Sequence, residues 1–150
     1  MPQSDELLTI ERVAVLQRVG LLGGVPGHKL IAVARLLEEV RVQPGALIIE
    51  RGMVEDWLFI VADGRVRVHV EDLTLVESGS GAVVGELAVL APAPRSASVT
   101  AIEPTLLLRL RRGPFEELLD DQPAIARAVI STLAHQLQAV ADERAGVAEA

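Results

Sequence analysis

Between positions 85 and 99 the chain combines a glycine, one acidic residue, a proline-rich segment and one basic residue. Gly85 can adopt backbone conformations closed to other residues, and we expect residues 87–90 to form one short helical turn whose free N–H groups favour an anion. Arg95 offers a planar fork that matches phosphate oxygens. Glu86 repels a phosphate, but its carboxylate is a good acceptor for a sugar hydroxyl. The segment therefore predicts a pocket for a small sugar phosphate.

The composition is that of one globular domain with few aromatic side chains. The chain has 150 residues, of which 50% are hydrophobic and only 2% aromatic. A chain of this length buries most of its apolar surface around a single core, and here that core must consist of Leu, Val, Ile and Ala. We therefore expect a single domain that spans residues 1–150.

Charge and cysteine content argue against several classes of function. The formal net charge of −7 disfavours the broad basic surface that direct nucleic-acid binding needs. The lack of cysteine excludes disulfides and thiolate metal sites. The N-terminus lacks the pattern of a secretory signal, and no run approaches the roughly 20 apolar residues of a membrane span. We expect a cytoplasmic protein, either free or on the cytosolic face of a membrane partner.

Two helical patterns occupy the first part of the chain. Apolar residues recur at helical spacing between Ser4, a suitable N-cap, and Gly20. Glycines and a proline then interrupt the pattern, and a second helix is predicted by the spacing of Leu30, Ile31, Ala34, Leu37 and Val40. We therefore expect N-terminal helices over about residues 4–38.

The middle of the chain changes to the period of β-strands. Short apolar runs are separated by closely spaced glycine turns. The valines at 66, 68 and 70 alternate with polar residues, which predicts a strand with one buried and one wet face. About eight short strands are available, which favours a jelly-roll-like, double-stranded β-helix. The predicted fold is α+β, with an antiparallel β-roll over about residues 39–112.

Two prolines mark the helices predicted over about residues 114–144. Pro114 and Pro123 suit the first turn of a helix. The second of these helices is long, and its apolar stripe consists of Ile125, Val129, Leu133, Leu137 and Val140. We expect this stripe to pack on the β-roll first. Its length beyond the domain edge also permits a homodimer through this helix.

The order of residues in the 85–99 segment resembles the phosphate-binding cassette of cyclic nucleotide-binding domains. The shared order is glycine, glutamate, Leu-Ala, a short loop and Pro-Arg-Ser-Ala. The resemblance covers roughly residues 20–140 and includes the segments 42–45, 50–52, 58–61 and 63–66. This family includes catabolite activator protein, regulatory subunits of cyclic-AMP-dependent kinase and nucleotide-gated channels. The resemblance implies a regulatory β-roll that binds a cyclic nucleotide and catalyses no reaction.

The resemblance also implies a role for each cassette residue. Glu86 would accept a hydrogen bond from the ribose 2′-hydroxyl, and Arg95 would pair with the cyclic phosphate. Backbone N–H groups near Leu87 and Ala88 would complete the phosphate shell, and Ser96 would lie beside the phosphate or the base. The candidate site consists of Gly85, Glu86, Leu87, Ala88, Arg95, Ser96 and Ala97.

The choice of base is left open by the sequence. Family members with alanine at the position of Ser96 often prefer cyclic AMP (cAMP) and some with threonine favour cyclic GMP (cGMP), so the serine gives a lean towards cAMP. Val84 stands where many members have an aromatic residue. The C-terminal helix has no aromatic lid for the base, and the candidates there are Arg127, Thr132, His135 and Gln136.

Other classes of function fit the sequence less well than ligand binding does. In a degenerate domain of the same fold, Glu86 and Arg95 would form a structural ion pair, and the chain would act by packing against a neighbour. A metalloenzyme is poorly supported because His28, His69 and His135 lie on different predicted elements. We expect these histidines to be solvated or at strand edges. No Ser-His-acid arrangement is present either, so we predict that the chain is not an enzyme.

The leading hypothesis is a module that senses cAMP, or less favourably cGMP, by a population shift that moves the C-terminal helices. A short basic cluster of Arg109, Arg111 and Arg112 is expected to be a solvated strand end. After Ala145 the chain has no basic helices of a DNA reader. We therefore expect either a domain of a larger protein or a free-standing regulator with a separate effector.

Overall fold

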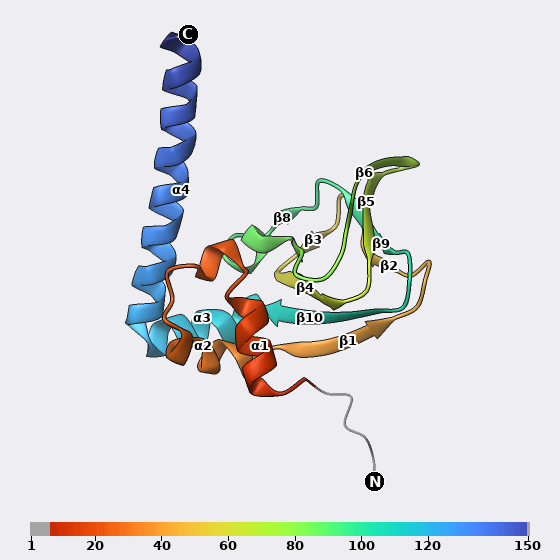
Figure 1. The fold of residues 1–150 in the computed structure, drawn as a ribbon, viewed down its shortest axis with the longest axis horizontal. Coiled ribbons are helices and arrows are strands. Elements are labelled where there is room, and N and C mark those ends of the chain that lie inside the picture. The colour runs from red at the N-terminus through yellow and green to blue at the C-terminus, as the bar shows by residue number, and fades with distance from the viewer. Residues whose placement is uncertain (1–6, 150) are drawn as a thin grey trace.

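Helices gather at one end of a β-roll, and a long C-terminal helix projects away from both (Figure 1). The computed structural model describes residues 7–149, with the side chains of residues 7–146. The predicted α+β class and the antiparallel β-roll flanked by helices are confirmed. Among residues 7–149 no helix is long and apolar enough to cross a membrane.

Two four-stranded antiparallel sheets form the roll. The first sheet has the order β1 (Glu38–Val42), β10 (Thr105–Arg111), β4 (Trp57–Asp63) and β7 (Val83–Val84). The second has the order β2 (Leu47–Ile49), β9 (Ser98–Ala101), β5 (Val66–Val70) and β6 (Leu73–Ser78). A third pair joins β3 (Val54–Glu55) to β8 (Ala93–Pro94). The described residues thus hold ten strands, which is more than the sequence predicts. Strands β3 and β8 have only two residues each, which is too few to give a recognisable sequence pattern.

The central strand β4 buries both of its faces. Leu58 and Ile60 belong to a core shared with the helices, whereas Phe59 and Val61 belong to the core between the two sheets. Strand β10 divides its leucines in the same way. Side chains alternate between the faces of a strand, so a strand covered on both sides is apolar at every position. This explains the continuous apolar runs at 58–61 and 106–108.

The N-terminal helices are shorter than the sequence pattern predicts. They are α1 (Thr9–Leu16), the 3₁₀ turn η1 (Gly20–Leu22) and α2 (Gly27–Ala34). Ser4, the expected N-cap, lies outside the described residues, and the first described helix begins at Thr9.

The second helix was predicted too long at its C-terminal end. Leu37 follows α2 and Val40 lies in β1, where it pairs with Leu107 of β10. A guanidinium nitrogen of Arg12 donates to the carbonyls of Ala34, at 3.2 Å, and Leu37, at 2.9 Å. These bonds tie α1 to the end of α2 and to the residue before β1.

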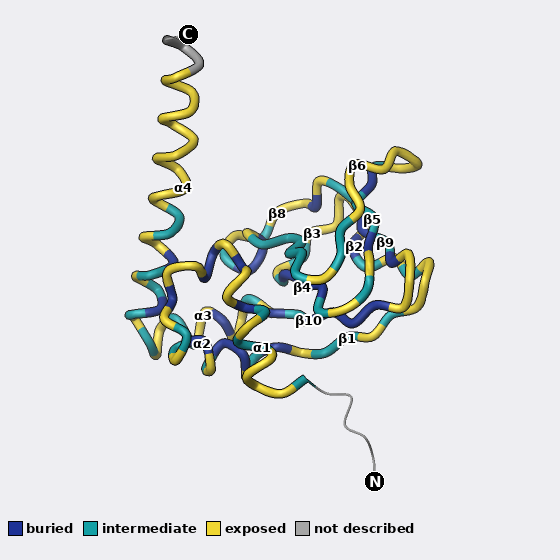
Figure 2. The backbone as a smooth tube through the Cα atoms, viewed as in Figure 1, coloured by how far each residue is buried: buried dark blue, intermediate teal, exposed yellow. Residues whose placement is uncertain are grey.

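The C-terminal helices are α3 (Arg112–Asp121) and α4 (Pro123–Glu149). Ile125 and Val129 of α4 are buried in the helix-side core. Farther along the stripe Leu137 is 72% exposed and Val140 47% exposed. The expectation that the whole stripe packs on the roll is therefore wrong, because the helix leaves the domain surface after its first half (Figure 2).

Strand β5 buries one position of the wet face that its alternation predicts. His69 is only 9% exposed. Its Nδ1 lies 2.8 Å from the Glu71 carbonyl and its Nε2 lies 2.8 Å from the Thr100 hydroxyl. The expectation of a solvated or edge histidine is wrong here, because β5 is an inner strand and the two ring nitrogens find partners in the following turn and in the neighbouring strand β9.

The predicted basic cluster is paired with acids. Arg109 and Arg111 both bond to Glu38, at 3.2 and 2.6 Å, and both lie over the ring of Trp57 at 5.7 Å from its centroid. The close Arg111 guanidinium, supported by Arg109, lowers the pKa of Glu38 although burial opposes this shift. The positive charges of Arg109 and Arg111 at this strand end are therefore partly balanced by the carboxylate of Glu38.

Candidate binding site

The cassette begins with a left-handed glycine. Gly85 has φ of 73° and precedes the 3₁₀ turn η2 (Glu86–Val89), which is the expected short helical turn. The Ala88 N–H donates to the Gly85 carbonyl at 3.1 Å, and the Leu90 N–H donates to the Leu87 carbonyl at 3.0 Å. The Ala88 donor is thus used inside the turn in this structure. The conformation suits glycine because L side chains crowd the backbone there.

Gly85 is also required for space. A Cβ atom at this position would lie 1.9 Å from Nη1 and 2.8 Å from Cζ of Arg95. Real Cβ atoms do not approach other heavy atoms so closely. The glycine therefore brings the guanidinium of Arg95 against the cassette backbone.

Arg95 is buried and held from within the roll. Its residue exposure is 8%, its Nε donates to Glu55 Oε1 at 3.4 Å and its Nη2 donates to the Trp57 carbonyl at 2.5 Å. The proline-rich segment before it is strand β8, whose partner β3 carries Glu55. A buried cation needs such partners because its desolvation costs free energy. The ion pair of Arg95 in the structure is with Glu55, and not with Glu86 as in the degenerate-domain interpretation.

Glu86 is held from the helical layer instead. Its carboxylate accepts the Leu21 N–H at the beginning of η1. A Cβ added to Gly20 would lie 3.4 Å from Glu86 Oε1 and 3.5 Å from Gln136 Nε2. The cassette glutamate, η1 and Gln136 of α4 therefore meet at one place.

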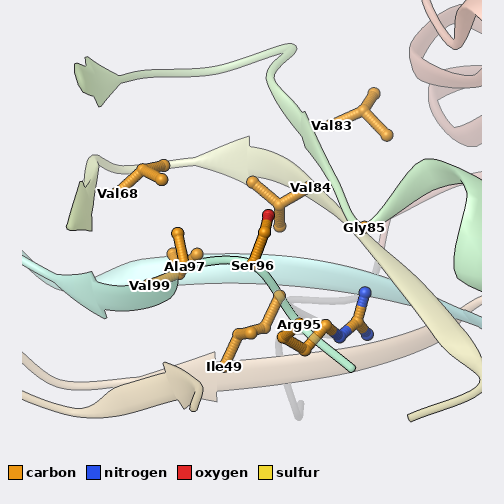
Figure 3. A pocket seen from close by; sticks show the side chains of 9 residues that line it. All are labelled: Ile49, Val68, Val83, Val84, Gly85, Arg95, Ser96, Ala97 and Val99. Carbon is orange, nitrogen blue, oxygen red and sulfur yellow. The ribbon is translucent and has the colours of Figure 1, made fainter. Parts of the chain in front are cut away.

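Two adjoining hollows lie on either side of the cassette. The first hollow has a volume of about 290 Å³, and Val68, Val84 and Val99 form its apolar wall. Arg95 lies at the opposite end of this hollow, beside Gly85 (Figure 3). The other, of about 330 Å³, is lined by Glu86, η2 and the 93–96 segment. Both include Gly85, Arg95 and Ser96. An apolar wall with one convergent cation suits a ligand that has a flat ring and an anionic group.

The structure brings the predicted site residues together. All of Gly85, Glu86, Leu87, Ala88, Arg95, Ser96 and Ala97 line one or both hollows. Leu87 is 60% exposed and Ser96 is also exposed, whereas Arg95 is buried. Among residues 7–149 no group of three or more His, Asp or Glu side chains is placed to hold a metal ion.

Three partners of the site were missed by sequence reasoning. They are Glu55, the Trp57 carbonyl and the Leu21 N–H. Two of them are backbone groups, which no residue type marks. The glycines at the beginning of η1 and just after it were the available signal. A Cβ at Gly24 would lie 2.9 Å from Thr132 Oγ1, and glycine is used where backbone approaches another element closely.

Comparison with known proteins gives one consistent result. The sequence profile of the family described as "Cyclic nucleotide-binding domain" matches residues 39–122. A cyclic nucleotide-gated potassium channel of Rhizobium etli is 36% identical over 118 residues, which is 75% of this chain and 33% of the channel. A cAMP-dependent protein kinase regulatory subunit of Yarrowia lipolytica is 34% identical over 67% of this chain and 27% of its own length.

Solved structures agree with these sequence relatives. The N-terminal domain of a transcriptional regulator from Streptomyces coelicolor A3(2) superposes with a TM-score of 0.79 and 27% identity, over 87% of this chain and 94% of that domain. The chain spans about a third of the length of the channel and less of the kinase subunit. The matched profile covers the β-roll, the cassette and α3. This chain belongs to the cyclic nucleotide-binding domain family, whose members are binding and regulatory modules.

Proposed function

We propose that this chain binds a cyclic nucleotide at the cassette, with cAMP as the first ligand and cGMP as the second, and passes the binding event to an effector through α4. The observation that supports the proposal best is the contact of Arg95 with Gly85. A buried guanidinium lies against a left-handed glycine at the end of an apolar-walled hollow. Nη1 of Arg95 lies beside Gly85, where a guanidinium donates charge-assisted hydrogen bonds to a phosphate, and the valines leave room for a base.

The proposed roles of the site residues follow from their positions. Arg95 pairs with the cyclic phosphate and Glu86 accepts from the ribose 2′-hydroxyl. Ser96 is exposed at the edge of both hollows, where its hydroxyl reaches the phosphate or the base. The N–H of Leu87, in the first turn of η2, adds a donor for the phosphate.

Helix α4 is the proposed output element. Its distal half exposes Leu137 and Val140, and exposed apolar side chains in a row suit a partner helix. A second copy of this chain or an effector segment would cover them. Sedimentation of the purified chain with and without cAMP measures whether the partner is a second copy.

Calorimetric titration with cAMP and cGMP tests the proposal. We expect saturable binding that Arg95→Ala abolishes and Glu86→Ala weakens. Arg65→Ala and Glu77→Ala are matched controls. Arg65 and Glu77 form an exposed ion pair with an N–O distance of 3.8 Å, and neither residue lines a hollow. Absence of heat and of a thermal shift at millimolar concentrations of both nucleotides would contradict the proposal.

A degenerate domain that binds no nucleotide is the second candidate, and one observation favours it. Arg95 already pairs with Glu55 and the Trp57 carbonyl, and Glu86 with the Leu21 N–H, so the two charged side chains of the site have protein partners. A ligand must displace or share these partners. The same titration separates the two candidates, because only a sensor gives saturable binding that depends on Arg95.

A further inference from the structure

We propose that the groove between α1 and α2 holds the distal half of α4, residues 134–149, from a second copy of this chain, and that the two copies exchange these helices reciprocally. The proposal concerns how the nucleotide-free chain assembles. It therefore goes beyond the proposed function and does not rest on it.

The groove lies between two short helices, apart from the cassette. One face of each helix forms its walls, which consist of Thr9, Ile10, Val13, Gly27, His28 and Ile31. Its volume of about 430 Å³ exceeds that of either cassette hollow. Ile10 is 75% exposed and Ile31 is 39% exposed, so apolar side chains of both walls face solvent. An apolar groove between two helices suits the apolar face of a third helix.

The distal half of α4 carries a stripe of the matching kind. Leu137 is 72% exposed and Val140 is 47% exposed. Ile130, seven positions before Leu137, is 65% exposed and continues the stripe towards the core. Spacings of seven and three residues place these side chains on one face of the helix. At 1.5 Å per residue the distal half is about 24 Å long and α1 about 12 Å, so α4 is long enough to cross the groove.

The two surfaces do not cover each other within one copy of the chain. Helix α4 starts beside the other helices and then extends away from α1 and α2 (Figure 1). A two-fold pairing covers both surfaces at once, because each copy supplies one groove and one helix. Pairing of two α4 helices alone would cover the stripe and leave both grooves open.

The charges beside the two surfaces are complementary. Arg35 follows Ile31 by one turn at the end of α2, and Glu143 follows Val140 by one turn. Both residues are exposed, and neither forms an ion pair among residues 7–146. One of the two directions in which α4 can lie in the groove brings Glu143 beside Arg35. Opposite charges at the rim of an interface select one orientation in this way.

Sedimentation of the nucleotide-free chain from micromolar to millimolar concentration tests the proposal. We expect a dimer. Ile31→Glu in the groove and Leu137→Glu on α4 should each raise its dissociation constant at least about tenfold, because each puts a carboxylate into an apolar contact. Leu75→Glu on β6 is the matched control, because Leu75 is 55% exposed and belongs to neither surface, and it should leave the dimer unchanged. Far-ultraviolet circular dichroism checks that each variant is folded.

Charge reversal tests the orientation of α4 with little risk to the fold, since Arg35 and Glu143 are both exposed. Arg35→Glu or Glu143→Arg alone should raise the dissociation constant about threefold. The double variant restores an opposite pair and should return the dissociation constant to that of the wild-type chain. A double variant that dimerises as weakly as the single ones would overturn the proposed seating of α4.

Cross-linking identifies the two surfaces that meet. The chain has no cysteine, so Ile31→Cys and Leu137→Cys chains can be mixed and treated with a short bismaleimide. We expect a link between positions 31 and 137 in this mixture, and none between 75 and 137 in a control mixture with Leu75→Cys. Linking of Leu137→Cys chains to each other without a 31–137 link would mean that α4 pairs with α4, and would overturn the proposal. A chain that stays monomeric at millimolar concentration would also overturn it, and would leave nucleotide binding at the cassette untouched.

Discussion

The two polar side chains of the cassette are anchored in different parts of the molecule. Arg95 is held inside the roll by Glu55 and the Trp57 carbonyl, on β3 and β4. Glu86 is held by Leu21, in the helical layer beside α4. Arg95, the proposed phosphate partner, is therefore held within the roll, whereas Glu86, the proposed ribose partner, connects the roll to the helices. We expect Arg95 to contribute more than Glu86 to the affinity for a cyclic nucleotide.

Apart from Arg95→Ala, the largest effect should come from Gly85→Ala, which disturbs the anchor of Arg95. The left-handed conformation costs about 1–2 kcal/mol for a residue with a side chain, and the new Cβ would displace the Arg95 guanidinium. Loss of a charged hydrogen bond costs about 1.5–3 kcal/mol, which corresponds to a roughly tenfold to hundredfold weaker affinity for cAMP. Calorimetry and urea unfolding measure the two effects.

The matched control for this variant is Gly113→Ala in α3. A Cβ there meets nothing within 4 Å, and its φ is not in the left-handed region. It should leave binding unchanged and keep or slightly raise stability. Equal effects of the two alanines would show that Gly85 has no special role.

A smaller effect of opposite sign is expected from Glu55→Gln. The amide keeps an acceptor for Arg95, but the negative charge beside the phosphate position disappears. Affinity for a cyclic nucleotide should rise a few-fold, while the free energy of unfolding falls by about 1 kcal/mol because a charged hydrogen bond becomes a neutral one. Weaker binding in this variant would mean that the charge of Glu55 is needed to position Arg95.

The smallest effect concerns Glu38, which lies outside both anchors. Its pKa is lowered in the folded chain by Arg111 and Arg109, so its stabilising contribution is complete above its unfolded pKa and is lost as the pH falls through the folded pKa. The side chain is 44% exposed, so this contribution is small and screened by salt. Glu38→Gln should flatten the loss of stability on acidification below about pH 4.5, measured by urea unfolding at low salt. An unchanged pH dependence would contradict this.

The sequence predicted which residues form the site better than it predicted which groups hold them in place. Residue types alone predict the turn at Gly85, the short helical turn after it and the clustering of the cassette residues. These features depend on local backbone preferences. Two features depend on tertiary packing instead. Helix α2 ends before Leu37, and α4 leaves the core before Leu137, because of what packs against each helix. Spacing alone does not contain that information.

The anchors themselves were beyond sequence reasoning for a physical reason. The Trp57 carbonyl and the Leu21 N–H are backbone groups present at nearly every position. Which of them meets a buried side chain is decided by tertiary packing. Glu55 is a side-chain partner, but it lies 40 positions from Arg95 and meets it only because β3 pairs with β8.

One titration observes both anchors together. In a nitrogen-15-labelled chain, the Nε–H resonance of Arg95 and the amide resonance of Leu21 can be followed as cAMP is added. We predict that both resonances shift saturably with the same dissociation constant, because the phosphate reaches Arg95 and the ribose hydroxyl reaches Glu86, the acceptor of the Leu21 N–H. If neither resonance moves at millimolar cAMP or cGMP, the chain is not a cyclic nucleotide sensor.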